Sequence, residues 1–188
     1  MKMWLLILML AVFGYAQAYD VKGVKLGTSL ADLKAQVSHP LDCSKLDKNS
    51  SSAKIELLDE ACRPTGKNPL VWAQDSFAGY PANLLYFLHK GMLWKVRIFL
   101  PASSFDDVVA TLTTKFGVPI ITHSEWKNAM GATLDNPTAA WQNGDVIVYK
   151  KYQQQLDLGS DLSFYSSEAW QAISTNLKAK TEAASQDL

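Results

Sequence analysis

The residues able to do acid–base, nucleophilic or metal chemistry are few and scattered in this chain. It has three histidines, His39, His89 and His123, and none has a second metal-ligating residue at the i, i+4 spacing of a helical zinc site. Ser124 and Glu125 follow His123, but successive residues of a strand point to opposite faces. The histidines are therefore expected to be surface or hydrogen-bonded side chains, with no metal ligand among them.

The motifs of phosphate-binding, dinucleotide-binding and hydrolase sites do not occur in the sequence. Asp106 and Asp107 stand where the first turn of a helix is expected, and carboxylates there complement the helix dipole. Asp157, Gly159 and Asp161 miss the spacing of a calcium loop. The sequence therefore predicts no catalytic residue, no metal site and no cofactor, and it leaves open an exported hydrolase whose site the pattern does not identify.

The start of the chain has the pattern of a secretory signal peptide. Lys2 supplies a positive charge, Met3–Phe13 is an unbroken apolar run, and Ala16-Gln17-Ala18 is a small-residue cleavage frame. The run is shorter than the about 20 apolar residues that span a bilayer. We expect cleavage after Ala18, a mature chain that starts at Tyr19 with no transmembrane anchor, and a periplasmic or secreted protein.

Length and net charge limit the number of domains and the classes of partner that fit this sequence. Removing 18 of the 188 residues leaves 170, enough to bury roughly 70% of the unfolded chain's surface as one domain. The 18 basic and 18 acidic residues balance, and loss of Lys2 takes the net charge to −1. A nucleic-acid binder usually carries a basic footprint, so this balance argues against nucleic acid as a partner.

The expected secondary structure mixes short helices with hairpins. Thr28 or Ser29 caps a helix that Pro40 ends, and a further helix begins at Ser103 or Ser104 and stops at Gly117. A last helix begins at Ser166 or Ser167, and Lys90-Gly91 makes the turn of a hairpin. Strands are expected at Val21–Leu26, Lys54–Leu58, Ala82–Leu88, Leu93–Leu100, Ile120–Trp126, Ala139–Gln142, Val146–Tyr152 and Leu162–Tyr165.

This order predicts the α+β class, a twisted antiparallel sheet with helices packed on one face. We expect one globular domain over residues 19–176, which leaves open two tandem helix–sheet modules at 19–100 and 101–176. Residues 177–188 form a polar tail.

Two short motifs carry a family resemblance. Gly23-Val24-Lys25-Leu26-Gly27-Thr28-Ser29 before an amphipathic helix, and Phe116-Gly117-Val118-Pro119 at a helix end, resemble the helix-on-antiparallel-sheet modules of the β-lactamase inhibitor protein and of small outer-membrane-assembly lipoproteins. The chain departs from the lipoproteins in having no lipid-acceptor cysteine, and its first helix lacks the G-x-P ending. The resemblance implies a fold and a protein-binding role, and it assigns no functional residue.

A mixed basic and aromatic surface is the expected binding site. Trp94, Val96, Ile98 and Leu100 are predicted to face the core from one strand. The residues of the expected surface lie on the opposite faces of their strands from the presumed core. They are Lys95, Arg97, Phe99, Tyr149 and Lys151. The leading hypothesis is a non-enzymatic protein that binds another exported or envelope protein, as an inhibitor or accessory factor. The alternatives are the hydrolase above and a carbohydrate or peptidoglycan binder that uses surface tryptophans; the tryptophans of the mature chain are Trp72, Trp94, Trp126, Trp141 and Trp170.

The two cysteines, Cys43 and Cys62, predict one disulfide in the exported protein, because an even count in an oxidising compartment favours pairing. Thiol labelling of denatured, non-reduced protein should find no free cysteine. Cys62→Ala should lower the free energy of unfolding by about 3 kcal/mol, since a loop of this size restricts the unfolded chain. Two labelled thiols in protein taken from the oxidising compartment would contradict the bond.

Overall fold

The computed structural model describes residues 19–37, 70–127, 131–153 and 159–186. The expected signal peptide, both cysteines and the strand expected at Lys54–Leu58 lie outside the described residues. The disulfide and the cleavage site therefore stay predictions.

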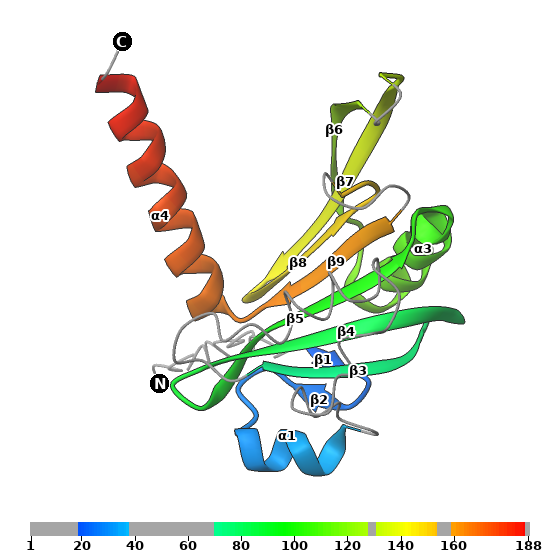
Figure 1. The fold of residues 1–188 in the computed structure, drawn as a ribbon, viewed down its shortest axis with the longest axis vertical. Coiled ribbons are helices and arrows are strands. Elements are labelled where there is room, and N and C mark those ends of the chain that lie inside the picture. Colours follow the sequence, from blue (N-terminus) through cyan, green and yellow to red (C-terminus); the bar gives the residue numbers. More distant parts are fainter. Residues whose placement is uncertain (1–18, 38–69, 128–130, 154–158, 187–188) are drawn as a thin grey trace, which may run out of the picture.

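Seven strands form one antiparallel sheet in the order β3-β4-β5-β9-β8-β7-β6. The strands are β3 (Leu70–Phe77), β4 (Tyr80–His89), β5 (Met92–Pro101), β6 (Ile120–Lys127), β7 (Thr133–Asn143), β8 (Asp145–Lys150) and β9 (Gly159–Tyr165). A separate hairpin pairs β1 (Asp20–Val21) with β2 (Val24–Lys25). The helices are α1 (Leu30–Gln36), the 3-10 turn η2 (Ala102–Ser104), α3 (Phe105–Phe116) and α4 (Ser167–Gln186). The predicted α+β class with an antiparallel sheet is confirmed (Figure 1).

Pairing of β5 with β9 joins the two halves of the chain in this sheet. Seven residue pairs connect the strands, from Lys95 opposite Tyr165 to Pro101 opposite Gly159. Strands β3 to β5 lie on one side of this seam and β8 to β6 on the other. Among the described strands, β3 and β6 are therefore the two edges of the sheet.

The turn between β4 and β5 has the predicted chemistry, but the strand after it contains a bulge. Lys90 and Gly91 both have positive φ, +51° and +79°, as a two-residue hairpin turn with the right twist requires. Leu88 pairs with Leu93, whereas Phe87 pairs with Lys95, so Trp94 is an extra residue on β5. The expectation that Trp94 faces the core beside Val96 is therefore wrong. Leu93 is buried there, and the Trp94 ring packs 5.1 Å from the ring of His89.

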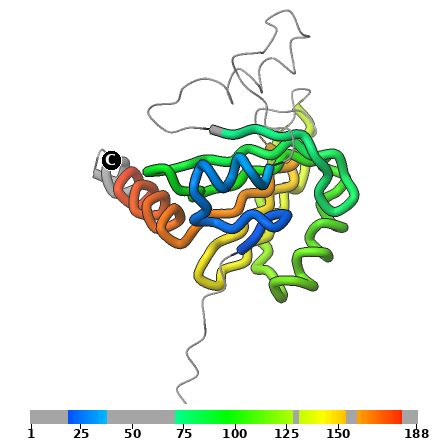
Figure 2. Tube along the Cα trace, turned by 90° about the horizontal axis from the view of Figure 1, so that it is seen from below, coloured from blue at the N-terminus to red at the C-terminus, as the bar shows by residue number. Residues whose placement is uncertain are grey.

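One face of the sheet carries the hydrophobic core. Alternate strand residues are buried on this face: Ala82, Leu84, Tyr86, Val96, Ile98, Leu100, Ala139, Trp141, Ile147, Tyr149, Leu162 and Phe164. The same cluster contains Val21 and Val24 of the β1–β2 hairpin, Leu33 of α1 and Val108 of α3. In Figure 2, α1 and the β1–β2 hairpin lie between α4 and α3.

Gly117 sets the direction in which the chain leaves α3 and enters β6. Its φ of +85° with ψ of −174° belongs to a region that essentially only glycine adopts. Its N–H donates to the Thr113 carbonyl at 2.9 Å, and its carbonyl accepts from the indole nitrogen of Trp141 at 2.7 Å. The predicted helix stop is confirmed. The expected cap at the other end of α3 is not, because the Ser104 hydroxyl bonds to the Pro101 carbonyl and to the Tyr149 phenol instead.

Helix α4 touches the sheet through its first turn and then projects away from it (Figure 1). The Ser166 hydroxyl accepts from the Ala169 N–H at 3.1 Å, as expected for a cap, and Ala169 is fully buried. The helix continues to Gln186, through residues expected to form a polar tail. Among the described residues, no helix is both long and apolar enough to cross a membrane.

Burial of Tyr86 predicts a loss of stability at alkaline pH. Desolvation, with a smaller contribution from the Asp75 carboxylate, raises the pKa of Tyr86 from 10.0 to about 12. A raised folded-state pKa contributes stability that is complete below pH 10 and is lost as pH rises from 10 toward 12, by about 1.4 kcal/mol per unit. Denaturant unfolding from pH 8 to 12 should show this slope, and Tyr86→Phe should flatten it. Tyr165→Phe, at a half-exposed tyrosine, is the control; equal slopes in all three proteins would contradict the assignment.

Candidate functional site

Three residues of the predicted binding surface do lie together, on the sheet face opposite the core cluster. Arg97 donates from Nε at 2.9 Å and from Nη2 at 2.7 Å to one Asp161 carboxylate oxygen. Its guanidinium also lies 4.5 Å from the ring centre of Phe99, whose side chain is only 8% exposed. The Lys95 ammonium is 5.2 Å from the Phe87 ring centre and 4.8 Å from that of Tyr165. These three side chains thus already contact other side chains of the same protein.

The other two residues are not part of that surface. Tyr149 is fully buried on the core face, where its ring stacks 4.8 Å from that of Phe105 at the start of α3. Its phenol lies 3.0 Å from both the Ser104 and the Ser160 hydroxyls. Lys151 follows β8, and its ammonium is 5.8 Å from the Phe105 ring centre.

The error has a physical cause in the composition of β8. Val146-Ile147-Val148-Tyr149 is apolar at both odd and even positions, so alternation alone does not fix which face is buried. The large aromatic ring goes inward because α3 offers Phe105 to stack on and two hydroxyls that bond to the phenol. Burial raises the pKa of Tyr149, while the bonds from Ser104 and Ser160 oppose that rise.

The tryptophans available for stacking on sugars are also fewer than expected. Trp72, Trp126 and Trp141 are buried. Trp126 stacks on Tyr152 at 5.1 Å, and Trp141 bonds to the Gly117 carbonyl. Trp94 and Trp170 are half-buried against neighbouring rings. A carbohydrate platform built from these five side chains has little support from their placement.

The strand β6 is the most exposed element of the sheet. Seven of its eight residues are exposed, and Trp126 alone is buried. Ile120 is 72% exposed, Ile121 is 47% exposed, and Val118 just before the strand is 89% exposed. Along one side β6 pairs with β7, and no other strand of the described residues pairs with its second side. We call the exposed stretch from Val118 to Glu125 the β6 edge.

The β6–β7 hairpin extends beyond the sheet because β7 parts from β8 at Pro137. The β7–β8 ladder runs only from Asn143 opposite Asp145 to Thr138 opposite Lys150. The Pro137 carbonyl still accepts from the Lys151 N–H at 3.1 Å, but proline has no N–H of its own to continue the ladder. The buried Asn136 side chain then bonds to both backbone groups of Tyr152, at 2.9 and 3.1 Å. In Figure 1 the hairpin rises away from the other strands.

The opposite edge, β3, is more protected. Val71, Trp72 and Ala73 are buried. At the other end of β3, Lys22 of the β1–β2 hairpin forms an ion pair with Asp75 and donates to the Ser76 carbonyl at 3.1 Å. Charge and a covering hairpin are two ways in which proteins block strand addition. The charges of β6, Glu125 and Lys127, lie only toward its far end, and no described segment covers the strand.

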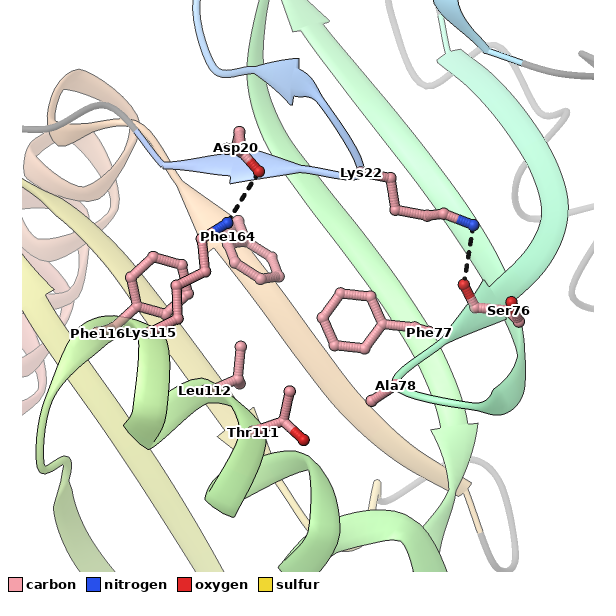
Figure 3. A pocket seen from close by; sticks show the side chains of 10 residues that line it. All are labelled: Asp20, Lys22, Ser76, Phe77, Ala78, Thr111, Leu112, Lys115, Phe116 and Phe164. Atoms are coloured by element: carbon pink, nitrogen blue, oxygen red, sulfur yellow. Dashed lines mark hydrogen bonds and ion pairs between the residues drawn. The ribbon is translucent and has the colours of Figure 1, made fainter.

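A hollow of about 400 Å³ lies between the β1–β2 hairpin, the β3–β4 turn and α3 (Figure 3). Its floor is apolar, with Phe77, Phe116, Phe164 and Leu112. At its rim, Lys115 is paired with Asp20 at 2.9 Å, and Lys22 is paired with Asp75 as above. The hollow therefore has no unpaired lysine or aspartate of the described rim to hold a charged ligand.

Titratable side chains do not gather at any described site. No group of three or more His, Cys, Asp or Glu residues in the described ranges could hold a metal ion. His123 and Asp135 face each other across the β6–β7 hairpin at 2.9 Å and are both well exposed. Comparison with protein-family models, with curated proteins and with solved structures gives no match.

Substitution at Tyr149 tests its reassignment from surface to core. Tyr149→Phe removes the phenol that bonds to two buried serines, so the free energy of unfolding should fall by about 1–3 kcal/mol. Tyr80→Phe is the matched control, because the Tyr80 phenol bonds to the exposed Asp107 and its loss should change stability less than loss of the Tyr149 phenol does. Equal stability of the Tyr149→Phe and wild-type proteins in urea unfolding would contradict the buried position.

Proposed function

We propose that the protein is an exported, non-enzymatic binding protein, and that an extended segment of another exported or envelope protein adds to its sheet along the β6 edge. The exposure of β6 is the observation that carries this proposal. An edge strand leaves every second N–H and C=O unpaired, and an added strand satisfies them. We also propose that α1 and α3 form a layer on one face of the sheet, and that residues 19–100 and 101–176 are tandem helix–sheet modules.

The distribution of side chains along β6 favours a foreign segment over a second copy. The apolar residues Val118, Ile120 and Ile121 are at one end, and the charged residues Glu125 and Lys127 are at the other. Two copies paired antiparallel about a twofold axis would set each apolar end against a charged end. A partner segment with apolar residues at one end only would match the isoleucines without burying charge against them.

The partner is expected to contact both faces of the strand. Ile120 points to the face that carries Trp126, and Ile121 points to the face that carries His123 and Glu125, because side chains alternate along β6. Specificity then comes from alternate side chains of the segment, while main-chain hydrogen bonds supply much of the affinity.

Site-specific photocrosslinking tests the geometry while the partner is still unidentified. A photoreactive residue would be placed at Thr122 or Ser124 on β6, and at Gln74 on β3 as the control edge, and each protein exposed to native envelope extract. Strand addition predicts adducts from β6 only, with Thr122 and Ser124 joined to sites two residues apart in one extended segment. Adducts at scattered sites, adducts to a second copy of this chain, or equal capture from Gln74 would contradict the proposal.

Lysine side chains placed on the β6 edge should weaken binding to the segment that photocrosslinking identifies. Ile120→Lys combined with Ile121→Lys removes the apolar anchors and adds charges that block strand addition. Affinity should fall at least about 30-fold, the equivalent of a hot spot of 2 kcal/mol. The melting temperature should change little, since both side chains are exposed. Thr114→Lys, on the exposed side of α3, is the matched control and should bind as wild type.

A further inference from the structure

A second inference, independent of the β6 edge, concerns the backbone nitrogen of Tyr19. This nitrogen donates to the Asp145 Oδ2 atom at 2.9 Å in a buried contact. The other carboxylate oxygen, Oδ1, accepts from the Ser167 N–H at 3.0 Å at the start of α4. Asp145 is only 9% exposed, and no lysine, arginine or histidine side chain of the described residues pairs with it. A buried carboxylate is thus held by two backbone N–H groups.

Tyr19 itself is fixed from three directions. Its ring packs 4.6 Å from that of Phe116 at the end of α3 and is almost fully buried. Its carbonyl accepts from the Leu26 N–H at 3.3 Å beyond the β1–β2 hairpin. The nitrogen therefore has a defined position at Asp145.

We propose that export-linked cleavage between Ala18 and Tyr19 creates an α-ammonium group at this position, which forms a buried ion pair with the Asp145 carboxylate. Hydrolysis breaks the bond between the Ala18 carbonyl carbon and the Tyr19 nitrogen, adding the hydroxyl of water to the carbon and its hydrogen to the nitrogen. The new carboxylic acid of Ala18 then loses a proton, and the primary amine of Tyr19 gains one. The small-residue frame Ala16-Gln17-Ala18 ends at the peptide bond whose nitrogen contacts Asp145. Removal of the leader thereby supplies the cation that the described surroundings of Asp145 lack.

The charged groups around the nitrogen favour its protonated form. Asp145 at the start of β8 contacts it directly. Asp20 of β1 is neutralised by Lys115 of α3. The Tyr19 phenol stays neutral, because burial and the Asp145 charge raise its pKa. An α-amino group titrates near pH 8 in unfolded chains, and a carboxylate partner moves that titration upward.

Comparison of two N-termini tests the ion pair. Protein processed to Tyr19 would be compared with the same chain preceded by Gly-Ser, in which the Tyr19 nitrogen remains an amide. The unfolding equilibrium constant of the processed form should be at least about tenfold smaller at pH 6.5, the equivalent of one pKa unit. The advantage is complete below the unfolded pKa near 8 and should disappear as pH rises through the folded pKa. It should be absent when both forms carry Asp145→Asn.

A chemical measurement tests the ion pair without requiring that the Asp145→Asn variant folds. Reductive methylation at pH 7.5 should modify the Tyr19 amine of the folded processed protein at least about tenfold more slowly than the glycine amine of the extended protein. Intact mass of exported protein fixes where the chain starts. Equal methylation rates, a stability difference that does not vary with pH, or an exported protein that starts elsewhere would overturn the proposal.

Discussion

Pairing of β5 with β9 is the constraint on which the rest of this structure depends. The last strand of the chain lies beside the third strand of the sheet, so seven residue pairs join segments more than 55 positions apart. The pairing brings the two halves onto one core face, where Ile98, Leu162 and Phe164 are fully or almost fully buried. It also determines which strands are interior and which are edges. β6 is an edge because β9, and not β6, occupies the position beside β5.

The consequences of that arrangement differ at the two edges. At β3 the β1–β2 hairpin supplies Lys22 to Asp75 and Ser76, and buried side chains fill much of the strand. At β6, Gly117 and Trp141 fix the exit from α3, and the β7–β8 ladder ends next to Pro137, where Asn136 bonds to Tyr152. Exposed isoleucines on a free edge are a hazard of aggregation unless something covers them. The proposed binding role accounts for the exposed isoleucines at the start of this edge.

Local patterns in the sequence predicted the elements better than the site. Gly91, Gly117 and the alternation of Val96, Ile98 and Leu100 identified turns, a helix end and a strand, because backbone φ and side-chain period are local properties. The bulge at Trp94 and the face of Tyr149 depend on partners far along the chain, Phe87 in one case and Phe105 in the other. The β6 edge was missed because edge position depends on strand order. The one local signal was Pro119 ahead of a strand that is apolar on both faces at its start.

The central claim is that β6 is an edge which a partner's strand completes. Residue-level hydrogen exchange over Ile120–Lys127 tests it most directly, first in the free protein and then with the captured segment. The account predicts alternating slow and fast amides in the free protein, since one side of β6 pairs with β7 and no described strand pairs with the other. Binding should slow the fast set and leave the slow set unchanged. Uniform protection of β6 in the free protein, or fast amides that stay fast in the complex, would contradict it.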